Sequence, residues 1–289
     1  MNYNVTHVTR YTYGATVELT TGVLRLKPVS RDGQVLEYFA LRTDPPCLPP
    51  IDRIDAFGNA VLSLRIEKPH RELTVEAASR VRIDRPSVLE MSPPWETVAA
   101  EALNIASLEP DSPAIGLYPS RALSLFDEAT AYARESFAEG RPVYEAAMDM
   151  ARRIRAEFVY DPQATEVSTP AHVAFEHRHG VCQDFAHIMI AGLRGLGLPA
   201  LYVSGYIRTV PPPGKERLAG ADASHAWVSL WCGASMGWTD FDPTNALAVQ
   251  NDHVEVARGR DYSDASPIES MVLSHGRHEL KVEVDVIPI

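Results

Sequence analysis

The sequence predicts an α+β protein in which a β-rich region precedes a mixed region of helices and strands. Residues 1 to about 85 contain alternating, β-branched runs separated by turn clusters such as SRDGQ, DPPCLPP and DAFGN. This spacing is typical of an antiparallel sandwich or barrel-like domain. After a proline-rich stretch, RPSVLEMSPPWETVAAEALN, the apolar residues recur with the period of a helix. We therefore expect two domains, residues 1–90 and 91–289.

Within the second region the apolar pattern predicts three helices followed by strands. The first two helices are expected in RALSLFDEATAYARESFAEG and VYEAAMDMARRIRAEFVY, and the third in CQDFAHIMIAGLRG, ended by the glycines and the proline that follow. Strand-like runs come next: LYVSGYIRTV, SHAWVSLWC and MGWTDFD. The tail from Glu279 alternates cleanly and is expected to be a strand. The apolar stripes of the first two helices are Leu123, Phe126, Ala129, Tyr132 and Ala133, and Ala147, Met150, Ala151 and Ile154.

Composition argues against several classes of partner. The 27 Lys and Arg residues face 38 Asp and Glu residues, a net charge of −11, so the chain should repel nucleic acid and anionic membranes. We see neither a signal peptide nor a run of about 20 apolar residues, and we expect a cytosolic protein. Three distant cysteines do not form a disulfide framework. The glycine-rich GLRGLGLPA follows a helix and precedes a strand, the reverse of a dinucleotide-binding loop, so no nucleotide cofactor is expected.

The stretch GVCQDFAH raises the question of whether Cys182 is a nucleophile, a metal ligand or a small core residue. Cys182 lies where the third helix is expected to begin. A helix N-terminus lowers the pKa of a cysteine thiol, and the thiolate is the nucleophilic form. The unpaired N–H groups there could also hold an oxyanion. Taken alone, however, a buried and inert cysteine is the simpler interpretation.

Two downstream motifs favour the nucleophile. SHAWVSLW places His225 near the start of a strand, and GWTDFDPTN places Asp240 and Asp242 on the next one. The short, glycine-containing connection predicts a hairpin that brings His225 beside an acid. A thiol–imidazole pair oriented by an acid is the arrangement that activates a cysteine. Strand parity puts both aspartates on the same face, so it leaves the choice between them open.

A metal site is the main chemical alternative. HRHGVC could combine His177 and His179 with Cys182, and His172 lies just upstream. Neither C-x-x-C nor H-E-x-x-H supports this reading, so we expect no metal. His187 faces another side of the helix from Cys182 and is not expected to be its base. Asp184 and the remaining cysteines, Cys47 and Cys232, are expected to be structural.

The set HGVCQDFAH, GLPALYVSGY, SHAWVSLW and GWTDFDPTN resembles the transglutaminase-like superfamily, in particular bacterial members described as cysteine proteases. RYTYG and DAFGN resemble the β domain that precedes the core in those proteins, and GRDYSDASPIE with the final strand resembles their tail. The resemblance implies a papain-like core at about residues 145–250, with a helix-borne Cys packed on an antiparallel sheet. The strand tail at residues 277–289 is assigned to the same domain.

Carried over by position, the resemblance implies a triad of Cys182 as nucleophile, His225 as base and Asp242 as orienting acid. The expected reaction is acyl transfer on a peptide or peptide-like amide, and hydrolysis is preferred because water is always available. Transamidation by the same triad and a non-catalytic binding module are the alternatives. Gln183 is a candidate oxyanion donor by adjacency alone. The loop RTVPPPGKERLAGADAS and the N-terminal domain are expected to shape access to the cleft.

Overall fold

The β-rich region forms two four-stranded antiparallel sheets in the computed structural model, which describes residues 1–31, 33–86, 91–209 and 223–289. Side chains of both sheets, including Val17, Leu24, Leu64 and Val75, share one buried apolar cluster. One sheet has the strand order β15 (His278–Pro288), β1 (Asn2–Val17), β6 (His70–Ile83), β3 (Gln34–Asp44), and the other has the order β14 (Ile268–Leu273), β2 (Leu19–Leu24), β5 (Ala60–Ile66), β4 (Asp52–Ile54). The expected β-rich N-terminal region is confirmed.

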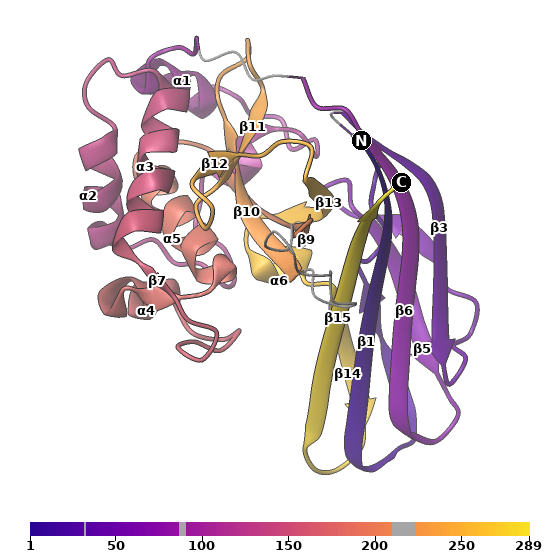
Figure 1. Ribbon diagram of the computed structural model, residues 1–289. Coiled ribbons are helices and arrows are strands. Elements are labelled where there is room, and N and C mark those ends of the chain that lie inside the picture. Colours follow the sequence, from indigo (N-terminus) through magenta and orange to yellow (C-terminus); the bar gives the residue numbers. More distant parts are fainter. Residues whose placement is uncertain (32, 87–90, 210–222) are drawn as a thin grey trace, which may run out of the picture.

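The C-terminal tail pairs within this sandwich, whereas the sequence assigned residues 277–289 to the second domain. β15 pairs antiparallel with β1 from Tyr3–Pro288 to Tyr13–His278, and β14 pairs with β2. The first and last strands of the chain therefore lie side by side, with the two termini close together (Figure 1). Alternation in the tail predicts a strand but cannot name its partner. The long strand β1 needed a neighbour on its second edge, and β15 supplies it.

The second domain is built on a five-stranded antiparallel sheet with helices against one face. Its strand order is β12 (Leu247–Ala248), β11 (Trp238–Asp242), β10 (Ala223–Trp231), β9 (Ala200–Ile207), β13 (His253–Gly259). The helices are α1 (Trp95–Leu103), α2 (Asp127–Ser136), α3 (Val143–Glu157), α4 (Ala171–His177), α5 (Cys182–Gly195) and α6 (Tyr262–Ala265), with a 3-10 turn at Pro113–Gly116. Two short parallel strands, β7 (Val159–Tyr160) and β8 (His179–Gly180), precede α5.

The predicted helices form, although the first begins later than its apolar stripe. Leu123 and Phe126 precede α2, whose first turn starts with Asp127 and Glu128. Acidic residues are favoured there because the N-terminal end of a helix carries partial positive charge. The stripe on α3 is buried as expected, from Ala147 to Ile154. No helix in the described parts of the chain has both the length and the apolarity to cross a bilayer.

The central helix of the second domain is α5, which begins at the predicted residue. Every residue from Gln183 to Arg194 is buried. A helix buried on all sides needs neighbours all round, and α5 has α2, α3 and α4 on one side and β9 and β10 on the other. This packing fixes the direction in which its N-terminus points.

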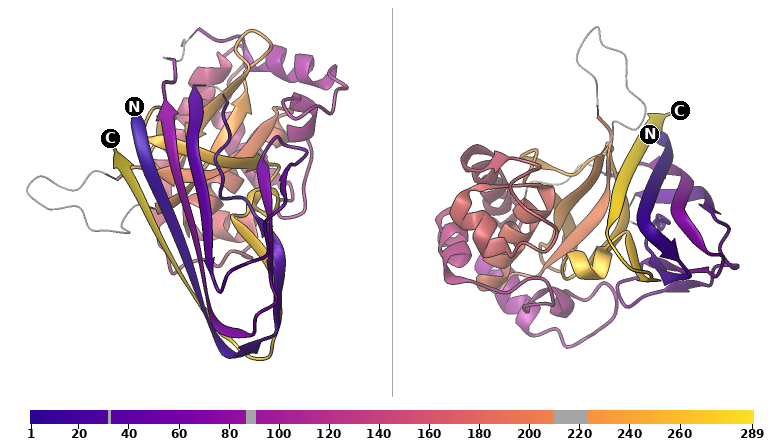
Figure 2. Two further views of the ribbon diagram at one scale, coloured as in Figure 1. Left: turned by 90° about the vertical axis from the view of Figure 1, so that its right-hand side faces the viewer. Right: turned by 90° about the horizontal axis from the view of Figure 1, so that it is seen from below.

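The β-sandwich covers the face of the five-stranded sheet that the helices leave open. Viewed from below, the helices, the five-stranded sheet and the sandwich follow one another as successive layers (Figure 2). Tyr206 and Val254 of the second domain share a buried cluster with Tyr3, Val284 and Val286 of the sandwich. This explains why β10 is apolar on both faces, since each face packs against protein.

Two buried amide side chains of the first domain hydrogen-bond to the backbone of β13, as a neighbouring strand would. β13 is an edge strand with an irregularity between Glu255 and Ala257. The side chain of Gln34 donates to the Glu255 carbonyl at 2.8 Å and accepts from its N–H at 2.9 Å. Asn59 does the same for Arg258, at 2.7 and 2.8 Å. The DAFGN turn thus ends in a residue that satisfies the backbone of the other domain.

We expect Asn59→Leu to lower the free energy of unfolding by about 1–3 kcal/mol, because the buried polar groups of Arg258 lose their partners. Asn59 is fully buried, whereas Asn104 is exposed at the end of α1, so Asn104→Leu is the matched control and should cost less than about 0.5 kcal/mol. Urea unfolding followed by tryptophan fluorescence measures this, since all four tryptophans lie after residue 90. Equal losses in both variants would contradict the bridging role.

Candidate active site

The turn before α5 is fixed by Asp184, which sets Cys182 at the first helical position. Val181 is extended and precedes the helix. Its N–H donates to Oδ2 of Asp184 at 2.8 Å, and the Thr165 hydroxyl donates to the same oxygen at 2.6 Å. A side chain at Gly180 would lie 2.6 Å from that oxygen, so only glycine leaves the acid room. Burial raises the pKa of Asp184, partly offset by these two hydrogen bonds, and the acid is structural as expected.

His225 lies between Cys182 and Asp242. Its Nε2 donates to Oδ2 of Asp242 at 2.8 Å, and the ring lines the same pocket as Cys182. The imidazole is 7% exposed and the carboxylate is fully buried. Burial alone would lower the pKa of His225, but the hydrogen bonds and charges of Asp242 and Cys182 raise it to about 10. The structure therefore brings together the three residues that the sequence singled out.

Both carboxylate oxygens of Asp242 accept several hydrogen bonds. Oδ1 accepts the backbone N–H groups of Thr244 at 2.9 Å and Asn245 at 3.1 Å, which closes the DPTN turn. Oδ2 accepts from His225, from the Asn245 side chain at 2.7 Å and from His253 at 3.1 Å. Burial alone would raise the pKa of this carboxyl, yet these bonds hold it well below its usual range. Asp242 is therefore an anion held in one orientation.

The neighbouring Asp240 has a different partner. It accepts from the indole N–H of Trp227 at 2.9 Å, so the two aspartates that strand parity could not separate are separated by their contacts. The expected hairpin joins β10 to β11, with Val228 opposite Phe241. Only Asp242 of the pair reaches His225.

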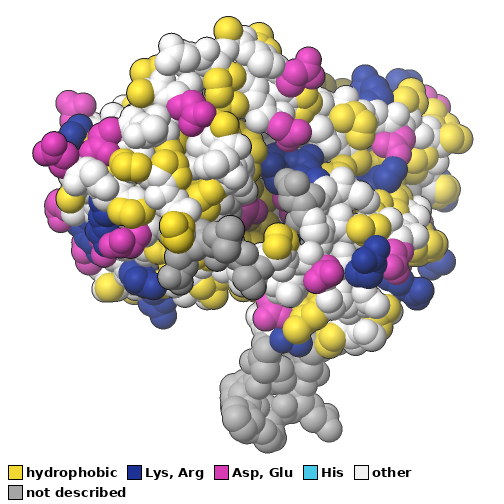
Figure 3. Space-filling view, turned by 90° about the horizontal axis from the view of Figure 1, so that it is seen from above, with side chains coloured by type: hydrophobic (Ala, Val, Ile, Leu, Met, Phe, Trp, Pro, Cys, Tyr) yellow, Lys and Arg dark blue, Asp and Glu magenta, His cyan; other side chains and the backbone are white. Residues whose placement is uncertain are grey.

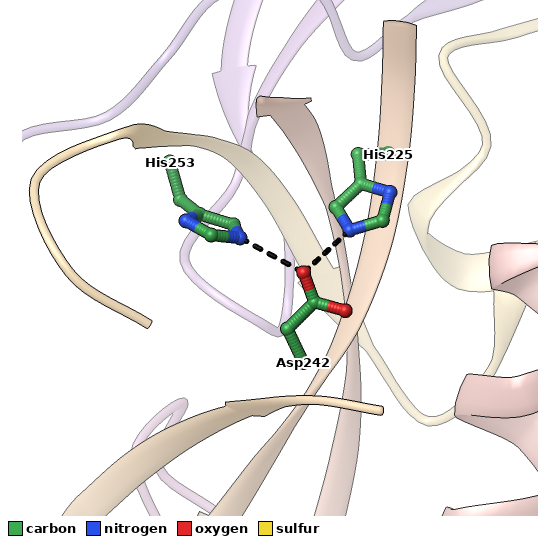
Figure 4. A group of neighbouring side chains, drawn as sticks. All are labelled: His225, Asp242 and His253. Atoms are coloured by element: carbon green, nitrogen blue, oxygen red, sulfur yellow. Dashed lines mark hydrogen bonds and ion pairs between the residues drawn. The ribbon is translucent and has the colours of Figure 1, made fainter. Parts of the chain in front are cut away.

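Sequence reasoning missed His253, a second imidazole on the same carboxylate. Figure 4 shows His225 and His253 approaching one oxygen of Asp242 from different strands. His253 is 2% exposed and packs edge-on against Trp227, with the ring centroids 5.2 Å apart. Trp227 in turn fills the space above Gly205, where a side chain would meet its ring at 2.6 Å. The sequence carries no local signal for this contact, because His253 lies on β13, which β10 and β9 separate from the strand of Asp242.

Asn245, also missed, could have been found from the sequence. An Asp followed by Pro-Thr-Asn favours a turn in which the Asp side chain accepts backbone N–H groups two and three residues on. That turn brings the Asn245 amide back to the carboxylate and within 3.5 Å of Nε2 of His225. The DPTN motif therefore fixes the orientation of Asp242 and places the Asn245 amide beside His225.

His225, Asp242 and His253 are the group whose spacing could suit a metal ion in the described part of the chain. Their three ligand atoms lie within 4.8 Å of one another. These atoms already pair with each other through hydrogen bonds, and an ion would have to replace both imidazole N–H groups on Asp242. The alternative set of His172, His177, His179 and Cys182 does not form such a group among the described residues. His179 instead contacts the carbonyl of His177.

The other candidate residues have partners of their own. His187 is buried on α5, where it accepts the N–H of Tyr262 at 3.2 Å, and burial lowers its pKa to about 4. Cys232 is fully buried, and burial raises the pKa of its thiol to about 12. Cys47 packs at the edge of the sandwich core. Gln183 donates its side-chain amide to the Val167 carbonyl at 3.0 Å, so its role as an oxyanion donor stays a prediction.

Cys182 and His225 open into a pocket with a volume of about 350 Å³. Its walls come from both domains, including Tyr202 and Ser204 of β9 and Thr9 of β1. The N-terminal domain therefore borders the site. Most of the loop that was also expected to border it, residues 210–222, lies outside the described residues.

The elevated pKa of His225 predicts how stability changes with pH. A group whose pKa is higher in the folded state stabilises the fold below its unfolded pKa, near 6.5, and loses that contribution as pH rises toward 10. The difference in unfolding free energy between the wild type and His225→Gln should therefore shrink between pH 6.5 and 10. Urea unfolding across this range measures it. A difference that stays constant or grows would contradict the assignment.

His253 is expected to hold Asp242, and through it His225, in place. His253→Phe keeps the ring against Trp227 but removes a donor to the carboxylate, so alkylation of Cys182 by iodoacetamide at pH 7 should slow by about tenfold. His253→Gln restores a donor at nearly the same position and should recover most of the rate. Peptide mapping separates Cys182 from the other two cysteines. Equal rates in both variants would remove His253 from the site.

Comparison with known proteins agrees with this architecture. A model of the bacterial transglutaminase-like N-terminal region matches residues 3–82, and one of the transglutaminase-like superfamily matches residues 130–243. An uncharacterized protein of Mycobacterium tuberculosis is 37% identical over 298 residues, covering 99% of this chain and 92% of that one. A protein-glutamine gamma-glutamyltransferase of Pseudomonas aeruginosa is 30% identical over 131 residues, covering 45% of this chain and 19% of that one.

A crystal structure from Cytophaga hutchinsonii, titled a "putative cysteine protease", superposes with a TM-score of 0.74 at 22% identity. The match covers 100% of this chain and 91% of that one, so the sandwich and the second domain recur together in one fold. The second family match spans Cys182, His225 and Asp242 but ends before His253. With a relative at 37% identity along nearly the whole chain and both domains matched by their family models, this protein belongs to the transglutaminase-like superfamily, with the bacterial N-terminal β domain.

Proposed function

We propose that the protein is a thiol-dependent enzyme that hydrolyses peptide or peptide-like amides through Cys182, His225 and Asp242. Superfamily membership supports thiol-dependent activity in general. The observation that carries the specific proposal is the position of His225, which donates to Asp242 and lines one pocket together with Cys182. A thiol, an imidazole and an orienting acid in this order form the unit that activates a cysteine nucleophile.

The first half of the reaction forms an acyl-enzyme. With a pKa of about 10, His225 is an imidazolium at pH 7, and a neighbouring imidazolium stabilises a thiolate. The Cys182 sulfur attacks the amide carbonyl carbon, and the carbonyl electrons move onto oxygen. N–H groups in the first turn of α5 have no intrahelical acceptor and can stabilise this oxyanion. The C–N bond then breaks as His225 transfers its proton to the leaving nitrogen.

The second half releases the acyl group. Neutral His225 takes a proton from water, whose oxygen attacks the thioester carbon. Breakdown of that intermediate expels the Cys182 thiolate and restores the imidazolium. Asp242 stays ionised throughout, because its low pKa keeps the charge that stabilises the imidazolium. The product is a carboxylic acid.

Transamidation is the second candidate, and the similarity to the Pseudomonas aeruginosa gamma-glutamyltransferase favours it. An amine would replace water in the second half, and the acyl-enzyme would be the same. The two reactions therefore differ in the acceptor that reaches the thioester. A cytosolic location, expected from the sequence, stays a prediction.

The decisive experiment is to trap the acyl-enzyme. Incubation with a peptide-amide library, an acid quench and intact mass spectrometry should show an acyl adduct that peptide mapping places on Cys182. Cys182→Ala should give none, and Asp242→Asn should lower kcat on the order of 10³-fold or more. Cys47→Ala is the matched control and should react as the wild type does.

Adding a primary amine during turnover separates the two reactions, since hydrolysis yields the free acid and transamidation yields the new amide. A folded wild-type protein that forms no adduct with any peptide would favour the non-catalytic binding module. An adduct on Cys47 would contradict the assignment of the nucleophile.

A further inference from the structure

We propose that the pocket beside Cys182 is a substrate subsite that is completed by the N-terminal β domain and selects uncharged apolar or aromatic groups. The reaction that follows binding depends on the proposed function. The binding preference depends only on the structure of the pocket. It identifies the class of substrate as amides that carry a neutral, largely apolar side chain next to the reacting bond.

The sandwich contributes one wall of the pocket through two strands that meet only in the folded chain. Thr9 lies directly opposite Val282, and Tyr11 lies opposite Leu280, in the pairing of β1 with β15. Directly opposed residues of an antiparallel pair share one face, and this face is turned toward Cys182. The start of α5 and the strands β9 and β10 provide the other walls. The first and last strands of the chain thus meet beside the reactive thiol.

The described walls of this pocket contain no Lys, Arg, Asp or Glu, although such residues make up 22% of the chain. A second hollow at the domain junction, about 120 Å³ in volume, is lined by Arg85, Asp240, Glu255 and Arg258. Figure 3 shows Lys and Arg side chains at the edge of a central hollow when the molecule is seen from above. Lys, Arg, Asp and Glu side chains therefore line one part of the junction and are absent from the described walls beside Cys182.

Away from the Cys182–His225 pair, the described pocket wall has one further histidine, His7, which is already paired and neutral. His7 contacts the Tyr206 hydroxyl at 3.0 Å and the Thr9 hydroxyl at 2.9 Å. Burial lowers the pKa of His7 to about 4, so the ring carries no charge at pH 7. Against the walls contributed by the sandwich, a carboxylate or ammonium group on the substrate would lose its water and meet no Lys, Arg, Asp or Glu among the described lining residues, which is costly. An apolar group loses no such hydration, and its transfer out of water is favourable.

The mouth of the pocket has apolar side chains in contact with solvent. Leu280 and Val282 on the sandwich side are 55% and 43% exposed, and Tyr160 and Val167 on the helical side are 50% and 64% exposed. Exposed apolar residues grouped at a concave site are typical of ligand binding. A volume of about 350 Å³ suits one aromatic or branched side chain with its adjoining backbone.

The test measures how fast Cys182 is labelled by three chloroacetamides that differ in one substituent. The probes are the N-benzyl compound and its para-aminomethyl and para-carboxyl derivatives, which are uncharged, cationic and anionic at pH 7. Rates on Cys182, read by peptide mapping, are divided by the rates of the same probes with glutathione. The uncharged probe should react about tenfold faster than either charged one.

Val282→Lys adds a cation to the wall at a half-exposed position. It should raise the rate of the anionic probe relative to the uncharged one by about tenfold and should lower the relative rate of the cationic probe. Thr12→Lys adds the same charge to the same sheet at an exposed position that is not part of the pocket, and it should leave all three ratios unchanged.

Equal corrected rates for the three probes on the wild type would overturn the inference. A shift in Thr12→Lys as large as that in Val282→Lys would also overturn it. These labelling rates do not depend on turnover of an amide. If the probes discriminate as expected while no acyl-enzyme forms, the subsite stands and the proposed function fails.

Discussion

The buried carboxylate of Asp242 is the interaction on which the site depends. A fully buried anion is tolerated when donors replace the water that it loses, and Asp242 receives five. Two of them close the turn after β11, and the others fix a side-chain amide and two imidazoles. The donors come from the turn after β11, from β10 and from β13, so this one charge holds the three strands in a mutual arrangement. The hydrogen bond from Nε2 of His225 to Asp242 fixes the imidazole ring at the pocket that Cys182 also lines.

The N-terminal domain covers the open sheet face and the edge strand of the second domain. Without the sandwich, β9, β10 and β13 would expose an apolar face, and the edge of β13 would lack the amides of Gln34 and Asn59. β1 can form this cover because β15 returns from the far end of the chain to pair with it. The pocket beside Cys182 is therefore assembled from the start, the middle and the end of the sequence.

Local patterns in the sequence predicted the parts of the site that local structure controls. The apolar period begins at Cys182, and the short glycine connection between Leu230 and Trp238 produces the hairpin that carries His225 and Asp242. The same reasoning could not find His253 or the partner of the C-terminal strand. His253 reaches Asp242 across β9 and β10, and β15 meets β1 over almost the whole length of the chain. Alternation shows that a segment will be a strand, but pairing between distant strands depends on which edges the rest of the fold leaves free.

The neutral pocket and the charged triad are consistent with each other in physical terms. Electrostatic interactions strengthen where water and other charges are absent, and the described walls place no additional charge beside Cys182 and His225. The imidazolium is then stabilised by Asp242 and the thiol rather than by surrounding residues. A charged substrate group would disturb this balance at the point where the oxyanion must develop, whereas an apolar group would exclude water and preserve it. In the proposed function, selection for a neutral substrate and activation of the thiol therefore both require that the wall built by the two ends of the chain adds no charge beside Cys182.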